Sequence, residues 1–432
     1  MTVSSLKSPS RKSAAFYLTL VLAGAVVSPD TAVGQTSDEG GIQLSFGLSL
    51  RLEAQDNRAL NAQSAGSSFE SRANLSFGLL TETRLERLAF SANGALRTLD
   101  TPTNDAVNGF IEPALSLSYG RTGANATLSF EASLREKDLS DNALFIDDTG
   151  APVVISGTAT QRNTQLEGGI DWGTSAPFGY GVFARLEDTT YRGGTALGLD
   201  GAQLNDSRRM TLGVTTRMNL GRTTGLNTHL IFSTFEQDGT PDSRETVSLR
   251  NLLTLERPLG AVTLALNLVD TEDGTRAETS IGRSLEMPLG VLSGAIGATR
   301  ATTGNVLMTG ELDYQHILKS GRLNFGLVRD VSSSDGQDTE QLNTRLRFGY
   351  FQELTALSTL RFDTDLAETK QTGTDLTSAT ASVGATYSHA LTRDWNLDLG
   401  YRHRYRDSDV TMDDARSNTV FMDLRRVFTG RF

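Results

Sequence analysis

The chain has 432 residues, carries a formal net charge of −11 and contains no cysteine. The missing cysteine excludes a disulfide scaffold and a lipoprotein, and an acidic chain without a basic patch lacks the charge that nucleic acid requires of a partner. The composition of 42 glycines against 9 prolines suits strands that need apolar residues at only half of their positions.

The first residues have the pattern of a secretory signal peptide. Three basic residues precede an uncharged run from Ala14 to Val27, and Ala32-Val33-Gly34 places small residues at the positions that a signal peptidase inspects. This run is shorter than the roughly 20 residues of a spanning helix, so an uncleaved anchor is the weaker interpretation. We predict a signal peptide at 1–34 and a mature chain at 35–432, in which no apolar run is long enough for a transmembrane helix.

From residue 42 onward, short segments alternate apolar and polar residues with a period of two. In Ile42–Leu52 the apolar residues stand at every second position, as in a strand with one apolar face. Alternation returns, clearly or weakly, in 69–79, 88–96, 111–119, 124–134, 164–172, 178–186, 210–220, 226–232, 247–255, 262–268, 277–285, 292–298, 306–318, 323–331, 342–350, 356–366, 379–387, 395–405 and 418–432. The pattern predicts an all-β fold, a transmembrane antiparallel up-and-down β-barrel of about 20 strands (18–22).

The connections between these segments are alternately short and long. Short turns stand near Pro258 and Pro288, among others. The longer, acidic segments are 136–157, 188–205, 236–243, 270–275, 332–339, 368–375 and 407–415. This alternation predicts short periplasmic turns, longer outer loops and periplasmic N- and C-termini. A soluble sandwich would have shorter strands and a solenoid a fixed repeat, whereas closure in lipid leaves no backbone group unpaired.

The last strand, 418–432, ends the chain with an aromatic residue. Phe428 and Phe432 stand on one parity of this segment. It resembles the C-terminal signal of Gram-negative outer-membrane β-barrel proteins, which the barrel-assembly machinery reads. The resemblance implies an outer-membrane location, with lipid, lipopolysaccharide and that machinery as partners; the alternative is an ordinary strand that ends in Phe. A weaker resemblance, carried by Arg51 to Arg58 with Gln55-Asp56-Asn57 closing the first strand, is to porin-like barrels found beside exopolysaccharide export systems.

Charged residues occupy the polar parity of several strands. They are Arg345, Arg347, Arg361, Asp363, Asp398, Arg402, Arg404, Arg406, Asp423 and Arg425. Such charges are tolerated only where water reaches them, and barrels of roughly 16 to 18 strands already leave an aqueous channel. We predict that these residues line a wet lumen, with the arginines from Arg402 to Arg406 and Arg425 forming a basic track. The alternative is a network that braces the wall.

No chemistry beyond transport is indicated. Ser388 and His389 are adjacent on a strand and therefore point to opposite faces, so they cannot act as a catalytic pair. The acidic loops match no metal-binding spacing. We expect no catalytic residue, no metal and no cofactor. The loop 136–157 could fold inward as a constriction, or its apolar clusters could prolong the flanking strands as a hairpin.

These observations favour one function over two others. A barrel without a plug domain before its first strand predicts a porin-like channel for passive diffusion of small hydrophilic solutes. The alternatives are a non-conducting or gated barrel associated with exopolysaccharide or protein export, and a structural barrel for surface attachment. The pattern selects neither a solute nor an oligomeric state.

Overall fold

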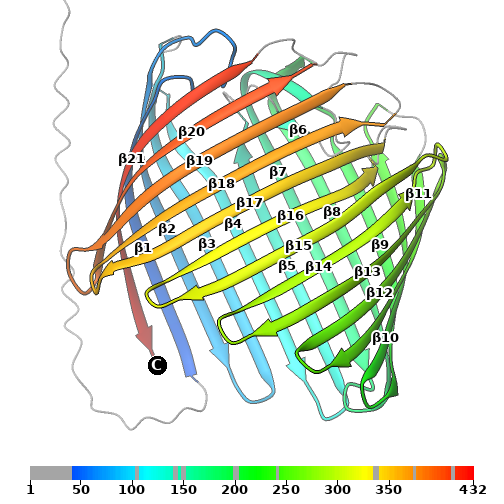
Figure 1. The fold of residues 1–432 in the computed structure, drawn as a ribbon. Helices are drawn as coiled ribbons and strands as arrows, with labels where there is room; N and C mark the ends of the chain where they lie inside the picture. Colours follow the sequence, from blue (N-terminus) through cyan, green and yellow to red (C-terminus); the bar gives the residue numbers. More distant parts are fainter. Residues whose placement is uncertain are drawn as a thin grey trace, which may run out of the picture. The chain divides into compact units, whose positions relative to one another are not determined.

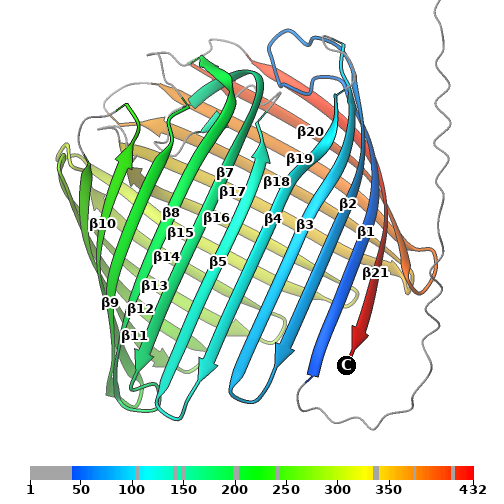
Figure 2. The same ribbon diagram turned by 180° about the vertical axis from the view of Figure 1, so that it is seen from behind.

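The computed structural model describes residues 41–432, except 103–106, 140–144, 147–151, 198–203, 240–242, 334–339, 373–375 and 410–413. The predicted signal peptide therefore lies outside the described residues. The compact unit that begins at Glu39 is a closed antiparallel β-barrel (Figures 1 and 2). No helix in the described part is long and apolar enough to cross a membrane.

Within the described ranges the wall has twenty strands, so the predicted number is confirmed. They are β1 (Gly41–Gln55), β2 (Ser68–Glu82), β3 (Glu86–Asp100), β4 (Val107–Thr122), β5 (Ala126–Asp138), β7 (Pro152–Trp172), β8 (Phe178–Leu197), β9 (Ser207–Gly221), β10 (Thr224–Gln237), β11 (Arg244–Arg257), β12 (Gly260–Thr271), β13 (Gly274–Met287), β14 (Gly290–Arg300), β15 (Val306–Leu318), β16 (Gly321–Ser333), β17 (Glu340–Thr355), β18 (Ser358–Gln371), β19 (Thr377–Ala390), β20 (Trp395–Ser408) and β21 (Ala415–Arg431). Each wall strand pairs with its neighbours in chain order. The two-residue strand β6 (Phe145–Ile146) pairs only with β7.

The barrel closes between its first and last strands. β1 pairs with β21 in register from Gln43 opposite Arg431 to Gln55 opposite Thr419. At the seam's end the Ile42 N–H donates to the Phe432 carbonyl (3.0 Å), and the Phe432 N–H donates back (2.8 Å). A sheet in lipid has to be closed, because an open edge would leave backbone N–H and C=O groups unpaired where no water can reach them.

The two ends of the barrel differ in their connections. We call the end where β1 begins and β21 ends the terminal rim; its turns are short, such as Pro258-Leu259 between β11 and β12. The opposite end, the loop rim, carries the longer connections, as predicted. One expectation is wrong: the segment 270–275 is a tight hairpin, in which only Glu272 and Asp273 separate β12 from β13. Acidic composition alone does not lengthen a connection.

Several strands extend far beyond the segments of clear alternation. β7 begins at Pro152 and β8 continues to Leu197, so the predicted loops 136–157 and 188–205 are in large part paired strand. Apolar alternation marks only the part of a strand that has lipid on one side and water on the other. Beyond that zone both faces are wet, and the backbone ladder continues without the signal.

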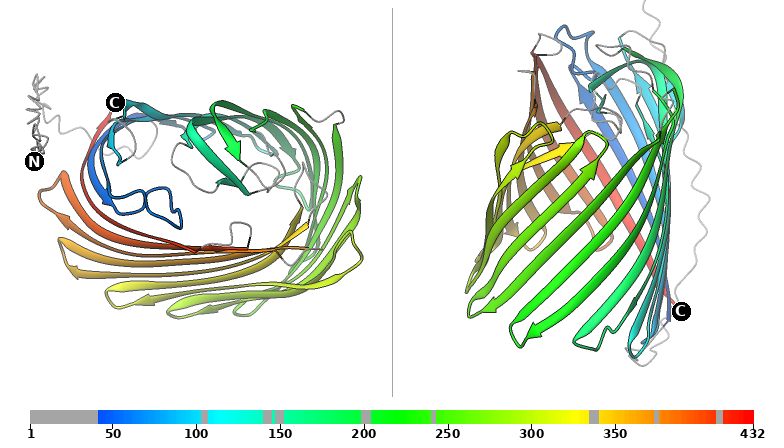
Figure 3. Two further views of the ribbon diagram at one scale, coloured as in Figure 1. Left: turned by 90° about the horizontal axis from the view of Figure 1, so that it is seen from above. Right: turned by 90° about the vertical axis from the view of Figure 1, so that its right-hand side faces the viewer.

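The apolar parity faces outward. The β1–β2 loop lies on the inner side of the wall (Figure 3), and its Arg58 bonds to Glu70, which places the polar parity inside. Large apolar side chains such as Leu212 and Ile296 are exposed on the other face. Aromatic pairs such as Phe46 and Phe428, with ring centroids 6.1 Å apart, stand near the terminal rim, where an aromatic girdle is expected.

The best-buried side chains cluster near the loop rim. The four largest fully buried ones among the described residues are Leu99, Leu139, Thr299 and Ser417, each within a few residues of that end of its strand. The barrel thus has no central apolar core. Its apolar surface is turned outward, and packing is tightest where the strands enter the loops.

Candidate functional site

The ten residues predicted to line the lumen all stand on the polar face, but in different settings. Arg345, Arg347 and Asp363 border a recess over β14–β18. Arg402, Arg404 and Asp423 border a different recess, whereas Arg425 borders a smaller one beside Ser49 and Asn74. Arg361, Asp398 and Arg406 border none of these three recesses.

We call the recess that is bordered by Arg402, Arg404 and Asp423 the charged recess. It has a volume of about 660 Å³ and is lined by side chains of β1–β5, β20, β21 and the β1–β2 loop. Its lining residues are Arg51, Glu53, Gln55, Arg58, Glu70, Arg72, Asn74, Arg97, Glu112, Lys137, Asp138, Arg402, Arg404, Thr419 and Asp423. Residues from both ends of the chain meet here because β21 closes against β1.

Ion pairs fix most of the carboxylates of the charged recess. Glu70 accepts from Arg58 at 2.6 Å and from Arg72 at 3.0 Å, and Arg72 also reaches Glu112 at 3.0 Å. Arg97 and Asp138 form a largely buried pair at 2.5 Å. A chain of alternating charges therefore runs along this wall.

Two further residues of the charged recess, Glu112 and Arg51, have notable conformations or contacts. Glu112 has a φ of 52°, in the left-handed region, beside the point where the β3–β4 register shifts. Such a conformation costs free energy for a residue with a side chain, and bulges commonly redirect one; here Glu112 contacts Arg72. Arg51 donates to Glu53 at 2.8 Å and lies over the Phe421 ring, 4.0 Å from its centroid.

The β1–β2 loop, residues 56–67, lies on the inner side of the wall (Figure 3), and its Arg58 lines the charged recess. Arg404 donates to the Arg58 carbonyl at 3.3 Å, and the Asn57 side chain donates to the Arg416 carbonyl at 2.9 Å. This loop was not predicted to enter the lumen. Of the predicted constriction, 136–157, the structure describes 136–139, 145–146 and 152–157, and there Phe145 pairs with Val153 between β6 and β7.

Asp56 fastens the start of this loop to β21. Its carboxylate accepts from the Asn418 backbone N–H at 2.7 Å and from the Asn418 side-chain amide at 2.6 Å. Burial raises the pKa of Asp56, but the hydrogen bonds from Asn418, together with those from the Asp56 and Asn57 backbone N–H groups, outweigh it and hold the pKa below its ordinary value. The Gln55-Asp56-Asn57 run, whose short polar side chains favour turns, was the available signal for this anchoring.

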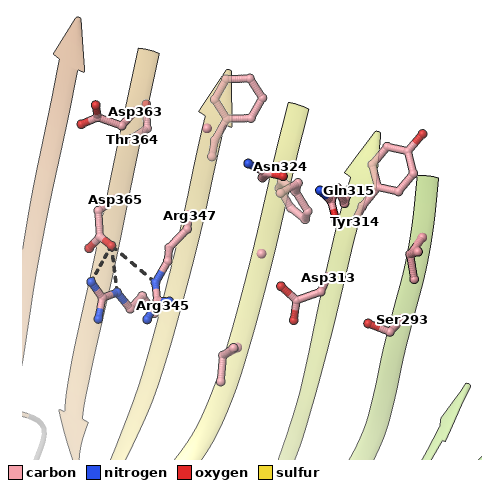
Figure 4. A pocket seen from close by; sticks show the side chains of 16 residues that line it. Ser293, Asp313, Tyr314, Gln315, Asn324, Arg345, Arg347, Asp363, Thr364 and Asp365 are labelled. Carbon is pink, nitrogen blue, oxygen red and sulfur yellow. Dashed lines mark hydrogen bonds and ion pairs between the residues drawn. The ribbon is translucent and has the colours of Figure 1, made fainter. Parts of the chain in front are cut away.

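The recess over β14–β18, which we call the second recess, has the opposite balance of charge (Figure 4). It has a volume of about 730 Å³. Asp365 accepts from Arg345 at 2.6 Å and lies 3.7 Å from Arg347. Asp313 and Asp363 also line it, so three carboxylates face two guanidinium groups.

The predicted basic track is wrong as a continuous feature. Arg402 stands opposite Thr419 on β21, whereas Arg425 stands opposite Asn396. Six residues of strand separate these two β21 positions, a distance of about 20 Å. Arg425 is instead 3.7 Å from Asp398, and Arg406 is only 4% exposed. Arg402 and Arg404 remain as neighbouring arginines that border the charged recess.

Ser388 and His389, the two residues considered for catalysis, both lie on β19. Ser388 and His389 pair with Thr359 and Ser358, respectively, and as strand neighbours they point to opposite faces. Among the residues that the structure describes, no group of three or more His, Asp or Glu side chains could hold a metal ion.

Comparisons with known proteins concern the fold. No protein-family model and no curated protein matches the sequence. Among solved structures, a double mutant of the ferric enterobactin receptor PfeA from Pseudomonas aeruginosa is similar, with a TM-score of 0.54 and 12% identity over 89% of this chain and 80% of that one. The siderophore receptor PirA from Pseudomonas aeruginosa gives 0.51 and 13% over the same shares. The chain has the fold of a Gram-negative outer-membrane β-barrel protein, as predicted.

Proposed function

We propose that the protein is an outer-membrane channel through which small hydrophilic solutes diffuse passively. The observation that carries this proposal is the pair of large recesses with charged side chains in their lining on the inner face of a twenty-strand wall. A barrel of this size is too wide for side chains alone to fill, and charged groups on its inner face are stable only in contact with water. The apolar outer face supports placement in lipid.

We further propose that the terminal rim faces the periplasm and that no plug domain fills the lumen. Short turns on the periplasmic side and long loops on the outer side are the usual arrangement of such barrels. The similar structures are named as receptors for ferric enterobactin and siderophores, so a receptor role is the competing transport function. A passive channel conducts small ions without any specific ligand or energy source, and a plugged receptor does not.

One observation favours a gated barrel as the second candidate. The β1–β2 loop lies on the inner side of the wall and is tied to β20 and β21 through Arg404 and Asn418. A loop held in this way narrows the lumen on one side. If it also met the opposite wall, the barrel would conduct only after the loop had moved, as expected of an export or ligand-gated barrel.

Single-channel recording of the purified protein in planar bilayers tests these functions. We expect stable, ohmic openings for the wild type in simple salt. A variant in which residues 58–66 are replaced by a short Gly-Ser turn should show a modestly larger conductance. A silent wild type with a conducting loop variant would support the gated barrel instead. Silence of both proteins, with normal heat-modifiable folding, would contradict the channel.

A further inference from the structure

We propose that the charged recess binds the carboxylate or phosphate group of an anionic solute. This inference rests on the proposed channel, because it names the class of solute that the pore retains during passage. The site is formed by Arg402 and Arg404 of β20, with Arg51 and Arg58 at its edge.

The balance of charge in the recess leaves a cationic surplus. Its lining contains seven basic and five acidic side chains. Four of the carboxylates, those of Glu53, Glu70, Glu112 and Asp138, already have an arginine within 3.0 Å. The fifth, Asp423, stands opposite Arg51 in the β1–β21 ladder. Arg402 and Arg404 of β20 take part in none of these four ion pairs, and they supply the surplus of positive charge.

Arg402 and Arg404 are placed to act on one ligand. They are two residues apart on a strand, so their side chains leave the same face about 7 Å from each other. Arg402 is exposed, and Arg404 donates one N–H to the Arg58 carbonyl at 3.3 Å. A guanidinium group has five N–H donors and matches a carboxylate in a bidentate geometry, so donors remain for a bound oxyanion.

The dimensions and the surroundings suit a small solute. The volume of about 660 Å³ lies within the usual range of small-molecule sites. The β1–β2 loop contributes Arg58 to the lining, and the recess lies on the inner face of the barrel, where a solute in the lumen reaches it. Partial cover lowers the local dielectric and strengthens a charge-assisted hydrogen bond, while the open side lets a solute enter and leave.

The second recess provides an internal control. It is similar in volume, but there Arg345 and Arg347 share Asp365, and Asp313 and Asp363 add two more negative charges. An anion should therefore avoid it. Loss of these two arginines should leave anion binding unchanged, although the same number of positive charges has been removed from the lumen.

Isothermal titration calorimetry on the full-length protein in detergent, at low salt, tests the site. The probes are trigalacturonate, which carries three carboxylates, and maltotriose, a neutral sugar of similar size. We expect trigalacturonate to bind the wild type at least about tenfold more tightly than maltotriose. The variant Arg402→Gln/Arg404→Gln should lose at least about tenfold in affinity, as expected for lost charge-assisted hydrogen bonds. The control Arg345→Gln/Arg347→Gln should stay within about twofold.

Equal binding of the two sugars, or equal loss in the two variants, would overturn the site. The comparison of the sugars uses the wild type alone, so it decides the question even if a variant fails to fold. A recording of the same samples separates the two proposals. Binding without conductance would contradict the channel and keep the site, whereas conductance without preference for trigalacturonate would keep the channel and remove the site.

Discussion

Replacement of Ser417 by alanine should weaken the seam that closes the barrel. Ser417 is 0% exposed, and its hydroxyl accepts a hydrogen bond from the Gln55 side-chain amide at 2.9 Å; Gln55 is 5% exposed. The bond joins Gln55, the last residue of β1 that pairs with β21, to Ser417, which lies two positions beyond the paired residue Thr419. In the alanine variant the Gln55 amide keeps its burial and loses this partner.

The expected cost follows from leaving one buried donor unsatisfied. Such a group costs about 1 to 3 kcal/mol, which is a change of about 5- to 150-fold in the unfolding equilibrium. Urea unfolding in phospholipid vesicles, followed by the fluorescence of Trp172 and Trp395, measures this difference. The matched control is Ser116→Ala, which removes an exposed hydroxyl pair with Ser91 (2.7 Å) and should change stability by less than about 0.5 kcal/mol.

Equal stability of the Ser417→Ala and Ser116→Ala variants would refute this reasoning. It would mean that water reaches the Gln55 amide in the folded barrel, or that the seam is held by the backbone ladder alone. A reduced slope of unfolding free energy against urea in Ser417→Ala would indicate a different failure, namely a seam that is already open in the native state.

Three further predictions concern topology, assembly and the loop. An epitope at Asp409 should be reached by antibody on intact cells and one at Pro258 should not; the reverse result would invert the proposed orientation. Phe432→Asp should slow assembly by the barrel-assembly machinery, which would be seen as unfolded protein in the periplasm. Because Phe432 is 80% exposed, the refolded variant should keep its stability. Normal assembly of the variant would mean that the terminal Phe is not an assembly signal. The folded-state pKa of Asp56 is lowered, so its clamp is fully present above the ordinary pKa of about 3.9 and is lost as pH falls through the lower folded value. A spin label on Ala65→Cys should therefore become mobile only in strong acid, and Asp56→Asn should remove that transition; a label whose mobility changed near neutral pH would contradict the clamp.

The strands could be predicted from the sequence because lipid and water impose opposite demands on the two faces of each strand. The segment Ile42–Leu52 carries that demand at every position, and β1 extends it by only a few residues. Where both faces are wet the demand disappears, which is why the sequence predicts a loop from 188 although β8 continues to Leu197. The even number of strands followed from the alternation of short and long connections.

The site was less predictable, because its contacts depend on register and on a loop. The sequence places Arg402 and Arg425 on the same face of neighbouring strands, but only the pairing of Arg425 with Asn396 shows that they stand far apart. The inward course of the β1–β2 loop depends on the hydrogen bonds between Asp56 and Asn418, whose positions are 362 residues apart in the sequence. No local pattern reports such a contact.

The two sides of the inner wall have different consequences for transport. On β12–β14 the inner positions include small side chains, among them Ala265, Ser280, Gly282, Ser293 and Ala295, opposite in parity to the exposed Leu264 and Ile281. Small neutral side chains take up little of the lumen there. Beside the β1–β21 seam, the larger charged side chains that line the charged recess take up more of it. In the proposed channel, width is thus set by one wall and preference for charge by another. Because the two properties reside on different strands, loss of Arg402 and Arg404 should change anion affinity while the conductance in high salt, where surface charge is screened, stays close to that of the wild type.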